Sequence, residues 1–157
     1  MDALYARDKQ LPYFSATTVA GKKIDLWSFK QRSNLLILLQ GGGPAAFEAA
    51  ADELAARADE WKWQDTEVVI ISRQELSGRV PADGFHSVTD PDGSLRRTLA
   101  GGATGAVLLL ADKFGALYSR WQPPDGDTID MDDVEKTVRL MQSECPECGD
   151  KGWLDQI

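Results

Sequence analysis

The sequence predicts an α/β fold in which a central mixed sheet is flanked by helices, and two observations predict it. Residues 35–39, 67–72 and 106–110 form short, mainly apolar runs without polar alternation, which is typical of strands covered on both faces. Residues 44–63, between the first two runs, have the composition of a helix. Strand, helix and strand in this order predict a parallel crossover, because parallel strands need a long connection.

The predicted helix at 44–63 has one apolar face, which we expect to cover the sheet. The residues of this face are Phe47, Ala51, Leu54, Ala55 and Ala58. A second amphipathic helix is predicted at 131–143 and closes the domain. Its apolar contacts are Val134, Val138, Leu140 and Met141.

Shorter elements complete the predicted order. Asp-Lys-Phe-Gly at 112–115 predicts a hairpin turn from the run at 106–110 into a strand at 116–121. A short strand is expected around 24–26. A short helix is expected at 94–99, capped by Asp or Ser after the turn Asp-Pro-Asp-Gly.

Length and charge bound the domain organisation and the partners. A chain of 157 residues suits a single core, so we predict one domain at 1–143 and a C-terminal tail at 144–157. The net charge of −8 repels nucleic acid and anionic membrane surfaces, which we therefore do not expect as partners. No apolar run approaches the roughly 20 residues of a membrane helix, and no secretory signal is recognisable at the N-terminus. A cytoplasmic location is the expectation.

The order of elements and four short motifs, over roughly residues 11–141, resemble those of the redoxins. The similarity is to the peroxiredoxin-like branch, the alkyl hydroperoxide reductase and thiol-specific antioxidant proteins. The motifs are Leu-Pro-Tyr-Phe at 11–14, Ile-Asp-Leu-Trp-Ser-Phe at 24–29, Asp-Pro-Asp-Gly at 90–93 and Leu-Ala-Asp-Lys-Phe-Gly at 110–115. The resemblance implies a thioredoxin-like fold and an origin in thiol redox chemistry.

The family's reactive thiol follows the first buried strand, at a helix N-terminus whose N–H groups and dipole stabilise a thiolate. Here residues 40–47 read Gln-Gly-Gly-Gly-Pro-Ala-Ala-Phe and hold no thiol. Relatives also often carry a cis-proline before the third strand, where this chain has Thr-Gly-Ala-Val at 104–107. We therefore predict a degenerate ancestral site and a non-catalytic binding or interaction module. The residues of this degenerate site are Gly43, Pro44, Phe47, Thr104 and Gly105.

The two cysteines of the chain lie in the tail, in the motif Cys-Pro-Glu-Cys-Gly at 145–149. This motif resembles the knuckle turn of rubredoxins and zinc ribbons. A closed zinc site needs four ligands, and the chain offers only Cys145, Cys148 and one histidine, His86. Carboxylates or a second chain would have to complete the site, so zinc at a half-site shared in a homodimer is one hypothesis.

Two other interpretations of Cys145 and Cys148 stay open. The pair could cycle between dithiol and disulfide, folded back near the turn at 41–47, which would make the protein a thiol-disulfide oxidoreductase or an antioxidant protein. Acidic neighbours such as Glu147 raise the pKa of these thiols and slow this chemistry. The remaining interpretation is a tail that only packs or crosslinks the C-terminus.

Other conspicuous residues are given structural roles. His86 has no nucleophile beside it in the sequence, so we interpret it as a hydrogen-bonded structural histidine. We expect core or edge packing for four tryptophans, Trp27, Trp61, Trp63 and Trp121. The acidic stretch at 125–133 lacks the spacing of a calcium loop and is interpreted as a solvated loop leading into a helix N-terminus.

Overall fold

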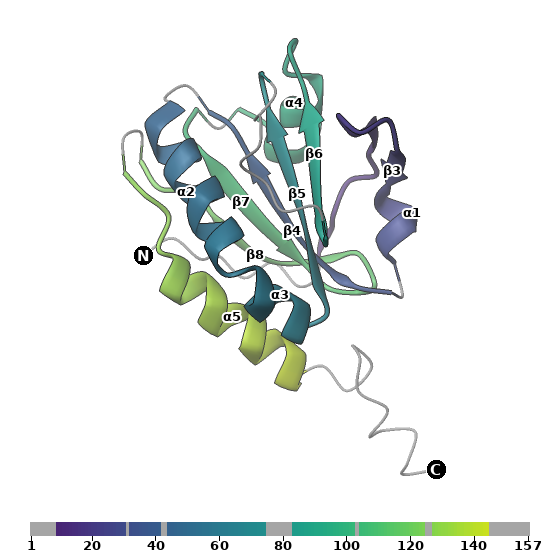
Figure 1. Cartoon of the computed structure of the whole chain (residues 1–157), viewed down its shortest axis with the longest axis vertical. Helices are drawn as coiled ribbons and strands as arrows, with labels where there is room; N and C mark the ends of the chain where they lie inside the picture. The colour runs from purple at the N-terminus through teal and green to yellow at the C-terminus, as the bar shows by residue number, and fades with distance from the viewer. Residues whose placement is uncertain are drawn as a thin grey trace.

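The centre of the protein is a six-stranded mixed sheet, seen in the computed structural model of Figure 1. The structure describes residues 9–30, 32–41, 44–74, 83–102, 104–124 and 127–144. The strands in spatial order are β1 (Lys9–Gln10), β8 (Ala116–Trp121), β7 (Val107–Ala111), β4 (Asn34–Leu39), β5 (Thr66–Ser72) and β6 (Phe85–Thr89). β4, β5 and β6 are parallel, whereas β7 is antiparallel to β4 and to β8. The predicted mixed sheet, crossover and hairpin are confirmed.

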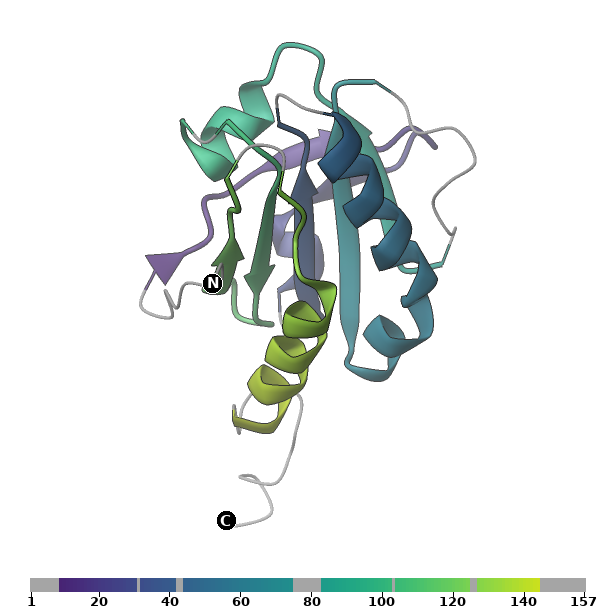
Figure 2. The ribbon, with the colours of Figure 1, turned by 90° about the vertical axis from the view of Figure 1, so that its left-hand side faces the viewer.

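Helices cover both faces of this sheet, as Figures 1 and 2 show. One face carries α2 (Pro44–Ala56), α3 (Ala58–Trp63) and α5 (Met131–Glu144). The other carries α1 (Leu26–Phe29), α4 (Ser94–Ala100) and a small hairpin of β2 (Ser15–Thr17) and β3 (Lys23–Asp25). No helix among the described residues is long and apolar enough to cross a membrane.

β4 shows why the central strands lack polar alternation. Leu36 and Leu38 pack towards α2 and α5, and Leu35, Ile37 and Leu39 pack towards α1 and α4. All five are at most 1% exposed. Because successive side chains of a strand point to opposite faces, a strand between two helical layers is apolar at successive positions, as residues 35–39 are.

The helix predicted over 44–63 is interrupted at Arg57, which is a correction. Arg57 has φ −107° and ψ 25°, outside the helical range. The indole nitrogen of Trp61 donates to the carbonyl oxygen of Leu54 at 2.9 Å. The Leu54 carbonyl near the end of α2 thus accepts a hydrogen bond from Trp61, and the Trp61 ring is buried in the core.

The strand expected around 24–26 ends one residue early, at Asp25, because a helix begins there. The Asp25 carboxylate accepts the backbone N–H of Ser28 at 2.9 Å, and the Ser28 hydroxyl accepts the N–H of Asp25 at 3.2 Å. This reciprocal capping starts α1 at Leu26. The helix expected at 94–99 is present as α4, but its N-cap residue is Gly93 and not Asp or Ser. The Asp90 carboxylate, three residues earlier, accepts the N–H groups of Leu95 and Arg96.

Three apolar side chains that were expected to be packed are exposed. Leu140, Trp27 and Trp63 are 40%, 62% and 82% exposed, respectively. Leu140 follows the buried Val134 by six residues, which places it on the other side of α5 at 100° per residue. Trp63 follows the buried Trp61 by two residues and likewise points away. Trp61 and Trp121 are buried as expected.

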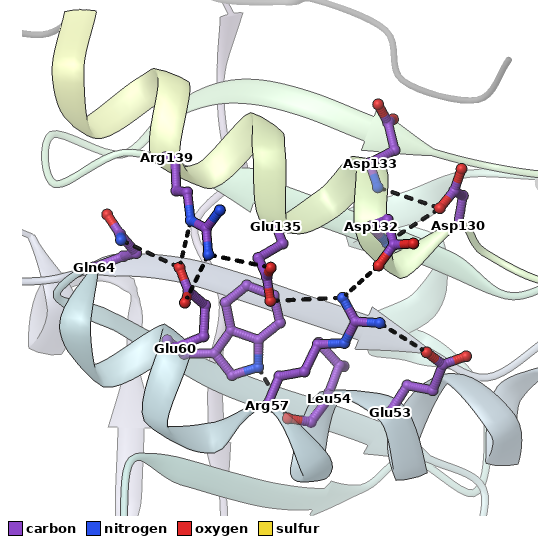
Figure 3. Close-up of polar contacts among 11 residues, drawn as sticks. Glu53, Leu54, Arg57, Glu60, Gln64, Asp130, Asp132, Asp133, Glu135 and Arg139 are labelled. Carbon is purple, nitrogen blue, oxygen red and sulfur yellow. Dashed lines mark hydrogen bonds and ion pairs between the residues drawn. The ribbon is translucent and has the colours of Figure 1, made fainter.

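Ion pairs fix the closing helix against α2 and α3, as Figure 3 shows. Arg139 donates to both carboxylate oxygens of Glu60 at 2.8 and 3.0 Å. Arg57, at the break between α2 and α3, contacts Asp132 at 3.1 Å and Glu135 at 3.6 Å. Most of these carboxylates and guanidinium groups are partly exposed, so each pair adds little stability. Together they set the position of α5 along its neighbours.

Replacing Leu38 tests the central packing. Leu38→Ala removes a fully buried side chain and leaves a cavity, so we expect the free energy of unfolding to fall by about 2–5 kcal/mol. Leu140→Ala is the matched control and should change it by less than about 1 kcal/mol. Urea unfolding followed by circular dichroism measures both. Equal losses in the two variants would contradict the assigned faces of β4 and α5.

Candidate functional site

The segment predicted to be the degenerate site lies at the carboxyl end of β4. Gln40 continues the sheet through its N–H, which bonds to the carbonyl of Ile71 at 3.0 Å. Pro44 is the first residue of α2 and is exposed. Phe47, one turn later, is only 1% exposed and belongs to the core beneath α2. Gly43 lies outside the described residues.

The structure brings this segment together with the second part of the predicted site. A Cβ atom on Gly41 would lie 2.2 Å from the carbonyl carbon of Gly105 and 2.5 Å from the carbonyl oxygen of Thr104. Both distances are far below van der Waals contact. The backbone at Gly41 therefore packs directly on the backbone at 104–105, and only glycine fits at position 41.

Arg96 joins these two backbone segments. One guanidinium nitrogen donates to the carbonyl oxygen of Gln40 at 2.6 Å, and another donates to the carbonyl oxygen of Gly105 at 2.7 Å. Arg96 itself is positioned by Asp90, whose buried carboxylate accepts its backbone N–H at 3.0 Å. The planar guanidinium suits such a bridge because its donors are fixed in one fork.

Little open space remains beside this bridge. The cavity lined by Gln40, Ser72, Arg73 and Arg96, among others, has a volume of about 10 Å³, which is room for roughly one water molecule. The side-chain amide oxygen of Gln40 accepts the backbone N–H of Arg73 at 2.8 Å and closes the outer side. The described part of the site is thus a tightly joined meeting of three chain segments.

No protein-family model matches the sequence, and no curated protein matches it. Solved structures do. The mitochondrial 2-Cys peroxiredoxin of Plasmodium falciparum aligns with a TM-score of 0.69 and 14% identity, over 88% of this chain and 94% of that chain. The yeast mitochondrial 1-Cys peroxiredoxin aligns with a TM-score of 0.71 and 14% identity, over 89% and 77%.

A putative thiol:disulfide interchange protein DsbE from Chlorobium tepidum aligns with a TM-score of 0.64 and 18% identity, over 85% of this chain and 96% of that chain. The fold is thioredoxin-like. At these identities the likeness concerns the arrangement of helices and strands and does not extend to activity.

Sequence reasoning missed the roles of Arg96 and Gln40 in this site. Arg96 stands beside Arg97 in a short helix, and Arg97 is exposed and donates to the carbonyl of Asp92 at 3.1 Å. Nothing in the sequence says which of two adjacent arginines turns inward. The choice follows from the start of α4, which the Asp90 carboxylate fixes.

A second polar cluster lies at the opposite, amino end of the thioredoxin-like sheet. His86 Nε2 is 2.7 Å from Glu67 Oε1, and the Ser33 hydroxyl donates to Glu67 Oε2 at 2.8 Å. The hydrogen bond from His86 holds the pKa of Glu67 below its usual value, although partial burial opposes this. Phe29 packs edge-on against the His86 ring, with centroids 5.4 Å apart.

This arrangement agrees with a structural histidine. The serine hydroxyl is directed at the carboxylate, so it is not placed for activation by the imidazole. A neighbouring cavity of about 340 Å³ is lined by charges of both signs, which favour no single class of ligand. The charged lining residues are Arg32, Lys62, Asp65, Glu67 and Asp83.

Cys145 and Cys148 lie outside the described residues. Within the described ranges, no group of three or more histidine, cysteine, aspartate or glutamate residues is placed to hold a metal ion. In the acidic stretch, the Asp130 carboxylate accepts the N–H groups of Asp132 and Asp133 at 3.1 and 3.2 Å. It therefore caps the start of α5.

Adding a methyl group at Gly41 tests the backbone contact. Gly41→Ala forces Cβ into Gly105, so we expect a loss of about 3 kcal/mol in the free energy of unfolding. Gly102→Ala is the control, because a Cβ atom there meets nothing within 4 Å, and should change it by less than about 1 kcal/mol. A Gly41→Ala variant as stable as the wild type would refute this packing.

The Glu67 cluster predicts a pH dependence of stability. A carboxyl group whose pKa is lowered by folding stabilises the protein above its unfolded pKa, about 4.3, and this contribution is lost as the pH falls through the folded pKa. We expect Glu67→Gln to be less stable than the wild type at neutral pH and the difference to shrink in acid. Urea midpoints across this range measure it.

Asp127→Asn replaces an exposed carboxyl group outside the cluster and is the control for the acid series. Its difference from the wild type should not follow the Glu67→Gln profile. A Glu67→Gln difference that stays constant with pH would show that the carboxylate charge contributes nothing.

Proposed function

We propose that this protein is a thioredoxin-fold binding or interaction module that performs no peroxidase chemistry at the N-terminus of α2. The observation that carries the proposal is the backbone contact of Gly41 on Gly105, bridged by Arg96. In the redoxins this end of the strand presents a thiol. Here residues 40–47 contain no cysteine, and the backbone at Gly41 packs directly on the backbone at Gly105.

The electrostatics of the site support the same proposal. A helix N-terminus and a nearby guanidinium group would both stabilise a thiolate. In this chain α2 begins with Pro44, which has no reactive side chain, and Arg96 donates to the carbonyls of Gln40 and Gly105. The guanidinium group that could activate a nucleophile bonds to backbone carbonyls instead.

The position of the end of α5 bears on the rival thiol-disulfide oxidoreductase. Gln142 accepts the side-chain N–H of Asn34 at 2.8 Å, so α5 ends beside the first residue of β4. The turn before α2 follows the last residue of that six-residue strand, about 20 Å away at roughly 3.3 Å per residue.

Cys145 is bonded directly to Glu144, the last residue of α5. Cys148 lies four residues beyond Glu144, a reach of at most about 14 Å. This reach argues against a catalytic cycle in which either thiol works in the α2 turn of its own chain. Away from that turn, the pair stays a candidate dithiol or half of a shared zinc site.

Insulin reduction and peroxide consumption test the proposal. We expect the wild type, Cys145→Ser and the double variant Cys145→Ser, Cys148→Ser to give the same rate as buffer alone. The reason is that no described group activates a thiol at the α2 N-terminus. A wild-type rate above background that is lost in Cys145→Ser would establish the oxidoreductase function and overturn the proposal.

The same preparations, purified without chelator, report the state of the thiols. About one zinc per two chains, lost in the double variant, would support the half-site shared between two copies. Absence of zinc with both thiols titratable would reject that role. Either result is compatible with a binding module, so the activity assay alone decides the proposed function.

A further inference from the structure

The face formed by the β2–β3 hairpin and α1 carries exposed aromatic side chains. Tyr13 is 52% exposed and Trp27 is 62% exposed. Their ring centroids lie 6.3 Å apart with the planes tilted by 42°. The Lys30 ammonium lies 4.5 Å from the centre of the Trp27 ring, a cation–π distance. Large aromatic side chains that stay exposed together are typical of protein contact surfaces.

This face is also basic in an acidic protein. Residues 9–33 contain five lysine or arginine residues and one acidic residue, Asp25, and so carry a net charge of +4. Because the whole chain carries −8, the remainder carries −12. Lys22 and Lys23, at the hairpin, are exposed. The charge is therefore strongly segregated along the chain, and this face carries three of these lysines, Lys22, Lys23 and Lys30, against one carboxylate, Asp25.

The aromatic residues are held on a rigid support. The capping box of Asp25 and Ser28 fixes the start of α1, and the N–H of Leu26 bonds to the carbonyl of Phe14 at 3.1 Å. Leu26 and Phe29 anchor α1 in the core. Trp27 lies between them in sequence, and its side chain is exposed and does not anchor the helix. A surface ordered before binding loses less entropy when a partner docks.

We propose that this aromatic and basic face, centred on Tyr13, Trp27, Lys22, Lys23 and Lys30, binds an acidic polypeptide segment of a partner protein. An apolar side chain of the segment packs on Trp27, and its carboxylates face the lysines. Charge complementarity of this kind speeds association and selects the partner. The inference rests on the proposed function as a binding module and names the chemistry of what is bound.

Other occupants fit the charge distribution less well. The −12 carried on the remaining chain repels every polyanion at long range, an acidic segment included, but nucleic acid and anionic membranes carry denser charge over a much larger surface than a short segment. A second copy could present its own acidic surface to this face. That contact joins two different patches and leads to open-ended assembly unless the rotation closes a ring. A short acidic segment of a separate partner can lie on this face alone, so it meets less of this repulsion, and it does not lead to open-ended assembly.

Fluorescence anisotropy with the full chain and a fluorescein-labelled peptide that repeats Asp-Glu-Leu tests the inference. We expect saturable binding that weakens as salt is raised. Trp27→Ala should weaken it about tenfold, as loss of a central aromatic contact does, and Lys22→Glu with Lys23→Glu should weaken it as well. Trp63→Ala is the matched control, because Trp63 is 82% exposed outside this face, and should bind as the wild type.

Four outcomes would overturn the inference. These are absence of saturable binding, equal losses in Trp27→Ala and Trp63→Ala, equal binding of an oligothymidylate, and self-association in sedimentation that Trp27→Ala abolishes. Circular dichroism confirms that the variants are folded. Failure here is distinguishable from failure of the proposed function, since the peptide assay does not depend on thiols and the insulin assay does not depend on Trp27.

Discussion

The structure depends on β4 being bonded on both edges and covered on both faces. β5 pairs with it in parallel and β7 in antiparallel orientation, and its apolar side chains reach the two separate halves of the core. Every other layer is positioned against this strand. The strand therefore also determines where the turn after it emerges, and with it the meeting of Gly41, Gly105 and Arg96.

The strands and the closing helix could be predicted because their signals are local. Uninterrupted apolar runs and the turn at 112–115 depend only on neighbouring residues. The break at Arg57 is accompanied by the bond from Trp61 to Leu54, a contact between helices that composition does not encode. The exposure of Trp27 and Trp63 was missed because their hydrophobicity was considered without asking which side of a helix each residue occupies. For Trp63 and Leu140, the spacing from buried residues in the same helix already indicated the exposed side.

The site shows the same division. The loss of cysteine at 40–47 was evident from the sequence, and the pairing of that segment with Thr104 and Gly105 was expected only through a resemblance. The contact of backbone on backbone at Gly41 and the choice of Arg96 over Arg97 arise from three-dimensional closure. The charge segregation between residues 9–33 and the rest was countable in advance. That the basic residues lie beside exposed aromatic rings could be seen only in the three-dimensional structure.

The burial of the four tryptophans that the structure describes divides them into two pairs of optical reporters. Trp61 and Trp121 lie in the core, whereas Trp27 and Trp63 face the solvent, so the two pairs occupy environments of very different polarity. Core indoles emit at shorter wavelength and are shielded from ionic quenchers, while surface indoles are quenched readily. Light emitted by the first pair follows the integrity of the fold, and light emitted by the second follows what touches the surface.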